Sequence, residues 1–350
     1  MQLLRDPLAA GATVADLRGR PLRDLRVSVT DRCNLRCAYC MPEEHYRWLP
    51  HESHLSVTEL ASVVQAFVAT GVRKVRLTGG EPLLRRDLPE LVARVAALQQ
   101  VTDLAITTNG TLLAGAAEDL RSAGLDRVTV SLDTLRAERH LALTRRDNHA
   151  DVLAGLDALG AAGFSGTKIN TVVMRGVNDD ELVDLVQFAP TVGAEVRFIE
   201  YMDVGGATHW SPESVVSAAE ILERLTDALG QVAPAPARSS APARRYSTTD
   251  GLTFGIVAST STPFCATCDR SRLTSDGRWF HCLYAEQGID LGRAVRGGAD
   301  TRYLEALIRD QWSLRQDQGA LDRLGLDDRR ATPVRVLRAD PHREMHTRGG

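Results

Sequence analysis

The stretch LRVSVTDRCNLRCAYC, residues 25–40, places three cysteines directly after a segment rich in aliphatic and β-branched residues. Residues 25–30 therefore predict a buried strand. Cys33, Cys37 and Cys40 follow at x3 and x2 spacing. Three thiolates at this spacing can hold three corners of an iron–sulfur cube and leave the fourth iron open to an outside ligand. The alternative is a zinc site, which needs a fourth ligand such as His45 or His51.

The strand at 25–30 opens a series of alternating segments. Strand-like segments recur at 72–80, 104–110, 127–133, 168–174 and 194–203, and helix-like segments lie between them at 56–70, 88–99, 150–163 and 179–189. Ser56 and Glu59 predict a capping box at the start of the first helix. The alternation predicts an α/β fold with a parallel sheet of six βα units, arranged as a partial or complete barrel or as an open sheet.

The rest of the chain lacks this rhythm. Helical periodicity covers 211–229, and the Pro-, Ala- and Ser-rich residues 232–245 predict a linker or exposed loop. Strand-like pieces at 253–259 and 278–283, a helix at 301–314 and a tail at 341–350 complete the chain. We expect two parts, a barrel over residues 1–230 and an extension over residues 231–350.

Composition excludes several classes of protein. The 350 residues are 43% hydrophobic and 25% charged with a net charge of −3, so no overall field attracts nucleic acid or an anionic membrane. No apolar run approaches the roughly 18–20 residues of a membrane span, and residues 1–20 lack the apolar region of a secretory signal. We expect a cytoplasmic protein. Its six cysteines fall in two triplets, which suits metal ligation better than a disulfide framework.

The second triplet consists of Cys265, Cys268 and Cys282. With the adjacent His281, these thiolates could bind zinc. The intervening Arg270 and Arg272, however, crowd two cations beside the ligands, and a purely structural site has little use for them.

The two lysines of the chain, Lys74 and Lys168, both lie inside strand patterns where an apolar residue is expected. A charge inside a barrel strand is costly unless it meets an anion. The partner is either a core carboxylate or an anionic ligand. Five arginines at strand ends or in the cysteine loops favour a triphosphate: Arg26, Arg76, Arg197, Arg270 and Arg272.

Cys-x3-Cys-x2-Cys with Tyr39 before the last cysteine resembles the signature of the radical S-adenosylmethionine (SAM) superfamily. Thr78-Gly-Gly-Glu-Pro82, after the second strand, looks like that superfamily's methionine-binding turn. The resemblance implies a partial (β/α)6 TIM-like barrel with a C-terminal extension that carries a second cluster. It also implies SAM contacts at Tyr39, Gly80, Ser131 and Met202.

The second triplet and most of the chain resemble the GTP 3′,8-cyclase (MoaA) family of molybdenum cofactor biosynthesis. The resemblance implies SAM, a [4Fe–4S] cluster at each triplet, and GTP contacts at Arg26, Lys74, Arg76, Thr107, Lys168, Arg197, Arg270, Ser271 and Arg272. The C-terminal Gly349 and Gly350 would enter the active site. Arg348 and Asp269 depart from the family pattern, where an apolar residue and an asparagine are usual.

The implied reaction converts GTP to (8S)-3′,8-cyclo-7,8-dihydroguanosine 5′-triphosphate, a radical SAM lyase activity. The implied partners are GTP, an electron donor and the cyclic pyranopterin monophosphate synthase that uses the product, with a monomer or homodimer as the assembly. Two other classes remain open: a radical SAM enzyme that modifies a peptide, and an electron carrier without a substrate. Nucleotide binding separates the cyclase from both.

Overall fold

A computed structural model describes residues 13–236 and 241–349. Its strands are β1 (Asp24–Ser28), β2 (Lys74–Thr78), β3 (Asp103–Thr108), β4 (Arg127–Ser131), β5 (Thr167–Val173), β6 (Ala194–Glu200), β7 (Val232–Pro234), β8 (Arg244–Thr248), β9 (Thr253–Val257), β10 (Arg270–Leu273), β11 (Arg278–Phe280) and β12 (Ile289–Asp290). Its helices are α1 (Val57–Ala69), α2 (Leu88–Ala96), α3 (Ala117–Ser122), α4 (Ala137–Thr144), α5 (His149–Ala161), α6 (Leu182–Phe188), α7 (Ala218–Leu229), α8 (Leu291–Arg296), α9 (Thr301–Ser313), α10 (Gly319–Leu324), α11 (Val334–Ala339) and α12 (Met345–Arg348).

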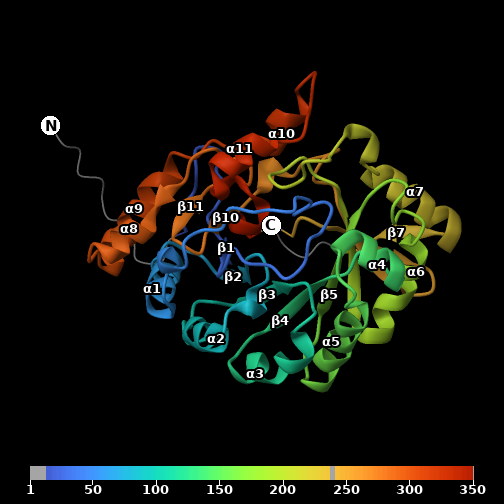
Figure 1. Ribbon diagram of the computed structural model, residues 1–350, viewed down its shortest axis with the longest axis horizontal. Helices are drawn as coiled ribbons and strands as arrows, with labels where there is room; N and C mark the ends of the chain where they lie inside the picture. Colours follow the sequence, from blue (N-terminus) through green and yellow to red (C-terminus); the bar gives the residue numbers. More distant parts are fainter. Residues whose placement is uncertain (1–12, 237–240, 350) are drawn as a thin grey trace.

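Strands β1 to β6 lie side by side in chain order and in parallel, with helices outside the curved sheet (Figure 1). This confirms the predicted partial barrel of six βα units. The segment after residue 230 extends the sheet at both edges, because β10 pairs in parallel with β1 and β9 pairs in parallel with β6. The extension therefore lengthens the wall of the barrel at both edges.

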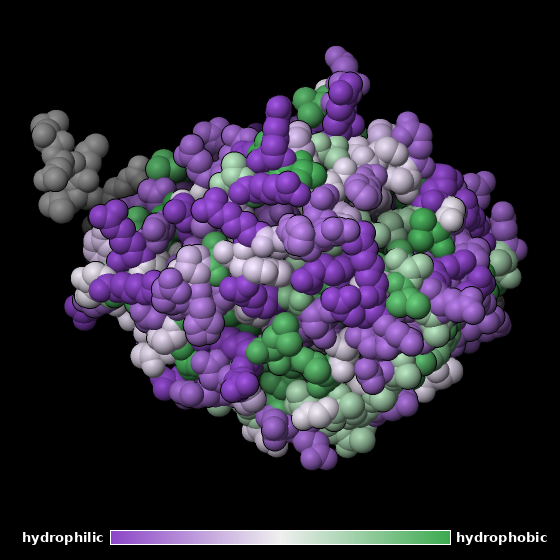
Figure 2. Space-filling model, in the orientation of Figure 1, coloured by the Kyte–Doolittle hydropathy of each residue, from purple (hydrophilic) through white to green (hydrophobic). Residues whose placement is uncertain are grey.

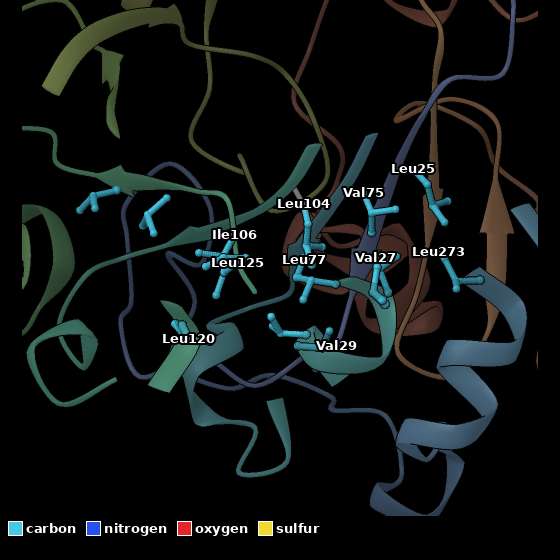
Figure 3. Packing of buried hydrophobic residues seen from close by; sticks show 14 of the residues in the cluster. Leu25, Val27, Val29, Val75, Leu77, Leu104, Ile106, Leu120, Leu125 and Leu273 are labelled. Carbon is cyan, nitrogen blue, oxygen red and sulfur yellow. The ribbon is translucent and has the colours of Figure 1, made fainter. Parts of the chain in front are cut away.

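Alternation along the strands separates the core from the barrel interior. Leu25 and Val27 of β1 and Val75 and Leu77 of β2 are buried in the layer between the sheet and the helices (Figure 3). The residues between them in sequence, such as Arg26, point the other way, into the barrel. Figure 2 shows a mostly hydrophilic surface on the viewed face, with hydrophobic residues in small groups. No helix within the described ranges is long and apolar enough to cross a bilayer.

The capping box predicted at the start of the first helix is confirmed. Ser56 accepts from the Glu59 backbone N–H at 3.3 Å, and the Glu59 carboxylate accepts from the Ser56 backbone N–H at 2.7 Å. The helix predicted over 211–229 begins only at Ala218, because a 3-10 turn, Pro212–Ser214, precedes it.

Two predictions for the C-terminal part are corrected. The loop predicted over 232–245 is wrong at its ends, where β7 and β8 pair as an antiparallel hairpin at the sheet edge. The expected tail at 341–350 folds into a 3-10 turn, Pro341–Arg343, and then α12, whose residues His346, Thr347 and Arg348 are buried. Backbone pairing and tertiary burial override the local composition in both places.

Candidate functional site

A cavity of about 360 Å³ occupies the barrel interior and reaches the carboxyl ends of the strands. All six cysteines line it and all six are free thiols. We refer to Cys33, Cys37 and Cys40 as the first triplet and to Cys265, Cys268 and Cys282 as the second triplet. This volume lies within the range of small-molecule sites. The fold therefore brings both predicted ligand sets to one chamber.

The first triplet lies in a loop fixed by backbone hydrogen bonds. The Cys40 backbone N–H donates to the Cys37 carbonyl at 3.0 Å, and the Ala38 N–H donates to the Leu143 carbonyl at 2.9 Å. Burial raises the pKa of Cys33 to about 11 and that of Cys40 still further. Because iron binds thiolates, loading the triplet must release protons.

The donor chemistry of both triplets fits an iron–sulfur cube. Among residues 13–236 and 241–349, no group of three or more His, Cys, Asp or Glu side chains could hold a single metal ion. Three cysteines on a cube bind three different irons and need not converge on one atom. Each triplet supplies three thiols and leaves one corner of the cube for another ligand.

The Gly-Gly-Glu-Pro turn is packed against the residues that lead into the first triplet. The Gly80 N–H donates to the Thr30 carbonyl at 2.8 Å, and the Glu81 N–H donates to the Arg32 carbonyl at 2.7 Å. A Cβ at Gly80 would overlap the Arg32 carbonyl oxygen. The glycine is needed because the turn and the cysteine loop touch backbone to backbone.

Glu81 ties the same turn to β3. Its buried carboxylate accepts from the Thr108 hydroxyl and the Asn109 N–H, both at 2.7 Å, and the Asn109 amide donates to Asn34 at 2.8 Å. Burial raises the pKa of Glu81 to about 7. Sequence reasoning missed the chain from Glu81 to Asn34, although the first of these residues lies in the quoted motif and the second lies between Cys33 and Cys37.

Replacing Gly80 with Ala is therefore expected to displace the first triplet and to remove most of the iron bound there. The added methyl group meets backbone atoms, which have no rotamer to escape into. Iron content after anaerobic reconstitution tests this expectation. Gly115→Ala is the matched control, because a Cβ at Gly115 meets nothing within 4 Å. Equal iron in the two variants would contradict the packing argument.

The four residues expected to contact SAM are all found at the cavity wall: Tyr39, Gly80, Ser131 and Met202. The Tyr39 hydroxyl hydrogen-bonds the Asp133 carboxylate, which also accepts from the Val172 N–H at 2.9 Å. Burial raises the pKa of Asp133 to about 6. Asp133 thus fixes Tyr39, a role that the sequence alone did not reveal.

A row of arginines crosses three neighbouring parallel strands. Arg272 on β10, Arg26 on β1 and Arg76 on β2 are register partners, and all three line the cavity. Arg270, two residues before Arg272 on the same strand, also lines the cavity. Its guanidinium stacks on the Phe264 ring, 4.5 Å from the ring centroid. These four arginines, Arg26, Arg76, Arg270 and Arg272, form one cluster, which we call the arginine row.

Electrostatics inside the arginine row are repulsive. Burial lowers the pKa of Arg26 well below its usual value, and the charges of Arg272, Arg270 and Arg76 add to the effect, although Asp24 opposes it. The Nε atom of Arg26 is buried without a hydrogen-bond partner among the described residues. Like charges that face one another without water or acceptors are costly, so the row favours binding of a polyanion.

Arg76 reaches across the sheet to Thr107. Its Nη1 donates to the Thr107 hydroxyl at 3.3 Å and to the Thr129 hydroxyl at 3.2 Å. Arg197 on β6 lines the cavity from the opposite side. Thr107 and Arg197 therefore both lie at the wall of the chamber.

Three of the predicted GTP contacts do not line the cavity. Lys74 begins β2 and is the register partner of Asp24 and Asp103. Lys168 is buried on β5, its Nζ donates to the Gly166 carbonyl at 3.3 Å, and burial lowers its pKa to about 7. Ser271 lies on the core-facing side of β10, between Arg270 and Arg272.

The C-terminal tail enters the barrel. Gly349 has a φ of 65°, a Cβ there would overlap the Thr78 hydroxyl, and its carbonyl accepts from Arg272 Nη1 at 2.7 Å. Arg348 points away, donates to the Leu283 carbonyl at 2.6 Å and stacks on Phe280. Gly350 lies outside the described residues.

Comparisons with known proteins agree with this geometry. The Radical SAM superfamily profile matches residues 27–189, and the Molybdenum Cofactor Synthesis C profile matches residues 194–321. GTP 3′,8-cyclase 1 of Mycobacterium tuberculosis (strain ATCC 25618 / H37Rv) is 56% identical over 342 residues, which cover 96% of this chain and 95% of that protein. GTP 3′,8-cyclase of Acidothermus cellulolyticus is 48% identical over 316 residues, 87% of each chain.

A solved structure shares the fold. The crystal structure of Streptococcus suis SuiB bound to S-adenosylmethionine superposes with a TM-score of 0.58 at 15% identity, over 89% of this chain and 72% of that one. At this identity, the likeness concerns the arrangement of helices and strands.

Proposed function

This chain belongs to the GTP 3′,8-cyclase family of the radical SAM superfamily, and from that membership we propose how its cavity carries out the reaction. The reaction converts GTP to (8S)-3′,8-cyclo-7,8-dihydroguanosine 5′-triphosphate for molybdenum cofactor biosynthesis. The observation that carries the site proposal is the arginine row, because Arg272, Arg26 and Arg76 face a substrate-sized cavity from matched positions on three strands. A triphosphate supplies the negative charge that such a row lacks.

Each cysteine triplet would serve a different ligand of the cavity. The first triplet would hold one [4Fe–4S] cluster, with Tyr39, Gly80, Ser131 and Met202 around SAM. When bound, this cluster and SAM supply a 5′-deoxyadenosyl radical that removes hydrogen from C3′ of GTP. The second triplet would hold another cluster beside the guanine base. The chain's own task is to fix C3′ and C8 of GTP in reach of each other and to exclude water.

The remaining predicted contacts are part of the proposal. Thr107, Arg197 and Arg270 would contact GTP from the cavity wall, whereas Lys74, Lys168 and Ser271 would act from the strands just behind it. We also propose an electron donor, the downstream cyclic pyranopterin monophosphate synthase, a cytoplasmic location and a monomer or homodimer. The division at residue 230 stays a prediction.

The test of the proposed function is anaerobic incubation of the reconstituted protein with SAM, GTP and a reductant. We expect a product with the mass of the cyclised nucleotide and equimolar 5′-deoxyadenosine. Formation of 5′-deoxyadenosine with GTP left intact would overturn it, and would favour the peptide-modifying alternative. The absence of nucleotide binding would point the same way.

Changing Cys265, Cys268 and Cys282 together to Ala is expected to halve the iron content, from about eight to about four irons per chain, because each triplet holds one four-iron cube. Iron analysis and the spectrum of the remaining cluster measure this. The mirror variant with Ala at the first triplet is the control and should also keep about four irons. Tightly bound zinc at the second triplet after anaerobic purification would contradict the assignment.

Replacing Lys168 with Met is expected to weaken GTP binding up to about tenfold at pH 6.5, because Lys168 would act on the phosphates through its charge from the strand behind the cavity wall and not through a direct contact. Burial lowers the pKa of Lys168 to about 7 in the free protein. A nearby phosphate would raise that pKa, so GTP binding must take up a proton above pH 7. The parent should therefore lose affinity from pH 7 to pH 9.

Calorimetric titration of GTP at several pH values, without SAM, measures both effects. The variant should show the weaker affinity and a smaller loss of affinity with rising pH. If Lys168→Met binds GTP like the parent at every pH, the lysine serves the structure of the barrel alone.

A further inference from the structure

A buried ion-pair network lies behind the second triplet, outside the cavity. It consists of Asp16, Arg20 and Arg315, whose side chains are 0–2% exposed. Arg20 Nε donates to Asp16 Oδ2 at 2.6 Å, and Arg315 Nη1 lies 3.4 Å from the same oxygen. None of these residues belongs to the proposed SAM or GTP contacts.

The two guanidinium groups of this network continue into the second triplet. Arg20 Nη1 donates to the Cys265 carbonyl at 2.9 Å. Arg315 Nη1 donates to the Cys268 carbonyl, also at 2.9 Å. Although burial opposes the effect, the charges of Arg270 and Arg315 lower the pKa of the Cys268 thiol. Two of the three ligand residues are therefore bound by arginines that share one carboxylate.

Local sequence explains the placement of Asp16 and Arg20. The segment Asp16-Leu-Arg-Gly-Arg20 forms a tight loop in which Asp16 Oδ1 accepts from the Arg18 and Arg20 backbone N–H groups, both at 2.9 Å. Gly19 has a φ of 75°, which a glycine adopts without strain. These local hydrogen bonds fix the position of the Asp16 carboxylate within the loop.

Arg315 follows the end of α9 and is held by an aromatic ring. Its guanidinium stacks on Trp312 with 4.4 Å to the ring centroid, and Trp312 Nε1 donates to the Arg20 carbonyl at 3.1 Å. The Asp317 carboxylate, 34% exposed, lies 3.7 Å from Arg315 Nε. Trp312 and Asp317 therefore both hold the Arg315 guanidinium in place.

Stability alone is a weak explanation for this network. Burying several charges costs desolvation free energy, and well-packed apolar side chains of similar volume often serve a fold equally well. Hydrogen bonds and positive charge next to the cysteines of an iron–sulfur cluster, by contrast, set its reduction potential. They also orient the ligands.

We propose that Arg315, held by Asp16 and Arg20, is a positioning residue that fixes Cys268 and makes the cluster at the second triplet easier to reduce. The inference rests on the proposed function only in requiring a cluster at that triplet. A guanidinium that is held next to a coordinating cysteine favours the more negative, reduced form of the cluster. The protein itself would thereby set the reduction potential of the cluster at the second triplet, independently of the substrate.

The experiment uses full-length protein in which Cys33, Cys37 and Cys40 are changed to Ala, so that one cluster remains. In this background we compare Arg315→Met, Arg315→Lys and Arg18→Met by iron content and by redox titration followed by electron paramagnetic resonance. Arg18 is the matched control because it comes from the same loop but donates to the Gln316 carbonyl at 3.0 Å rather than to a cysteine. Neither GTP nor SAM is needed.

At the potential where the parent cluster is half reduced, Arg315→Met should show about a tenfold lower ratio of reduced to oxidised cluster, equivalent to about 59 mV for one electron. Arg315→Lys, which keeps the charge, should shift less, and Arg18→Met should match the parent. A cluster at the parent potential in Arg315→Met overturns the inference. If that variant does not fold, an unshifted potential in Arg315→Lys overturns it instead.

A failure of the proposed function gives a different result. If the part of the proposed function on which the inference rests, a cluster at the second triplet, is wrong, the background protein itself, with Arg315 intact, would hold no iron at that triplet. The two failures are therefore distinguishable before any variant of the network is compared.

Discussion

Deleting Gly349 and Gly350 is expected to abolish formation of the cyclised product while both clusters, SAM binding and the melting temperature stay close to those of the parent. Gly349 lies against Thr78, at the end of β2, and its carbonyl accepts from Arg272 of the arginine row. Gly349 thus contacts both a residue of the proposed methionine-binding turn and a cation of the proposed phosphate site. The loss of Gly349 removes these two contacts rather than a part of the hydrophobic core.

The measurement is product yield under anaerobic turnover, together with 5′-deoxyadenosine. A substitution sharpens the test: Gly349→Ala should fail like the deletion, because the added Cβ overlaps the Thr78 hydroxyl and the backbone φ is 65°. Gly251→Ala is the control, since Gly251 also has a positive φ of 85° but has nothing within 4 Å. A synthetic peptide ending in Gly-Gly is expected to restore part of the turnover. Product formation at the parent rate by the truncated enzyme would contradict a role for the tail.

Replacing Arg26 with Met should reduce GTP affinity about a hundredfold and eliminate detectable product, and yet leave the protein at least as stable as the parent. Arg26 is the middle member of the arginine row, and its contact with a phosphate would be worth up to roughly 3 kcal/mol. In the free protein the same guanidinium is buried among Arg272, Arg270 and Arg76. Removing it relieves repulsion, so affinity and stability change in opposite directions.

GTP titration and thermal unfolding of the same samples check this prediction. Arg127→Met is the control for a strand arginine, because Arg127 forms an ion pair with Asp103 away from the cavity lining. That variant should lose stability through the unpaired carboxylate and keep its GTP affinity. Destabilisation of Arg26→Met with unchanged affinity would show that Arg26 has a structural role instead.

The fold was predictable from the chain because its signals are local. The capping box at Ser56 and Glu59, the alternating strand and helix segments, and the cysteine spacing each depend on residues close in sequence. The segment β10 was not recognised, because Arg270 to Leu273 lie between two cysteines and carry one aliphatic residue. Its strand character comes from pairing with β1, a contact about 250 residues away that no local pattern encodes.

The residue types of the candidate site could be predicted from the sequence, but the position of each residue along the barrel could not. Both lysines lie on strands, as the pattern indicated, but Lys74 is the first residue of β2, and the cavity lining on that strand begins with Arg76. Two residues along a strand correspond to about 6.6 Å. Alternation shows which face a side chain takes and not how far along the barrel it lies. The burial of His346 to Arg348 was likewise invisible, because it depends on where the tail docks.

The pairing of β10 with β1 has a consequence for how the protein is made on the ribosome. β1 lies between β2 and β10, so one of its edges has no strand partner until residue 273 has left the exit tunnel. Until then, the nascent chain carries nearly the whole parallel sheet with one edge of β1 unpaired. Strands of neighbouring chains associate through such unpaired edges. Slow or interrupted translation between residues 200 and 273 should therefore lower the soluble yield. Chaperones that shield unpaired strands should raise it.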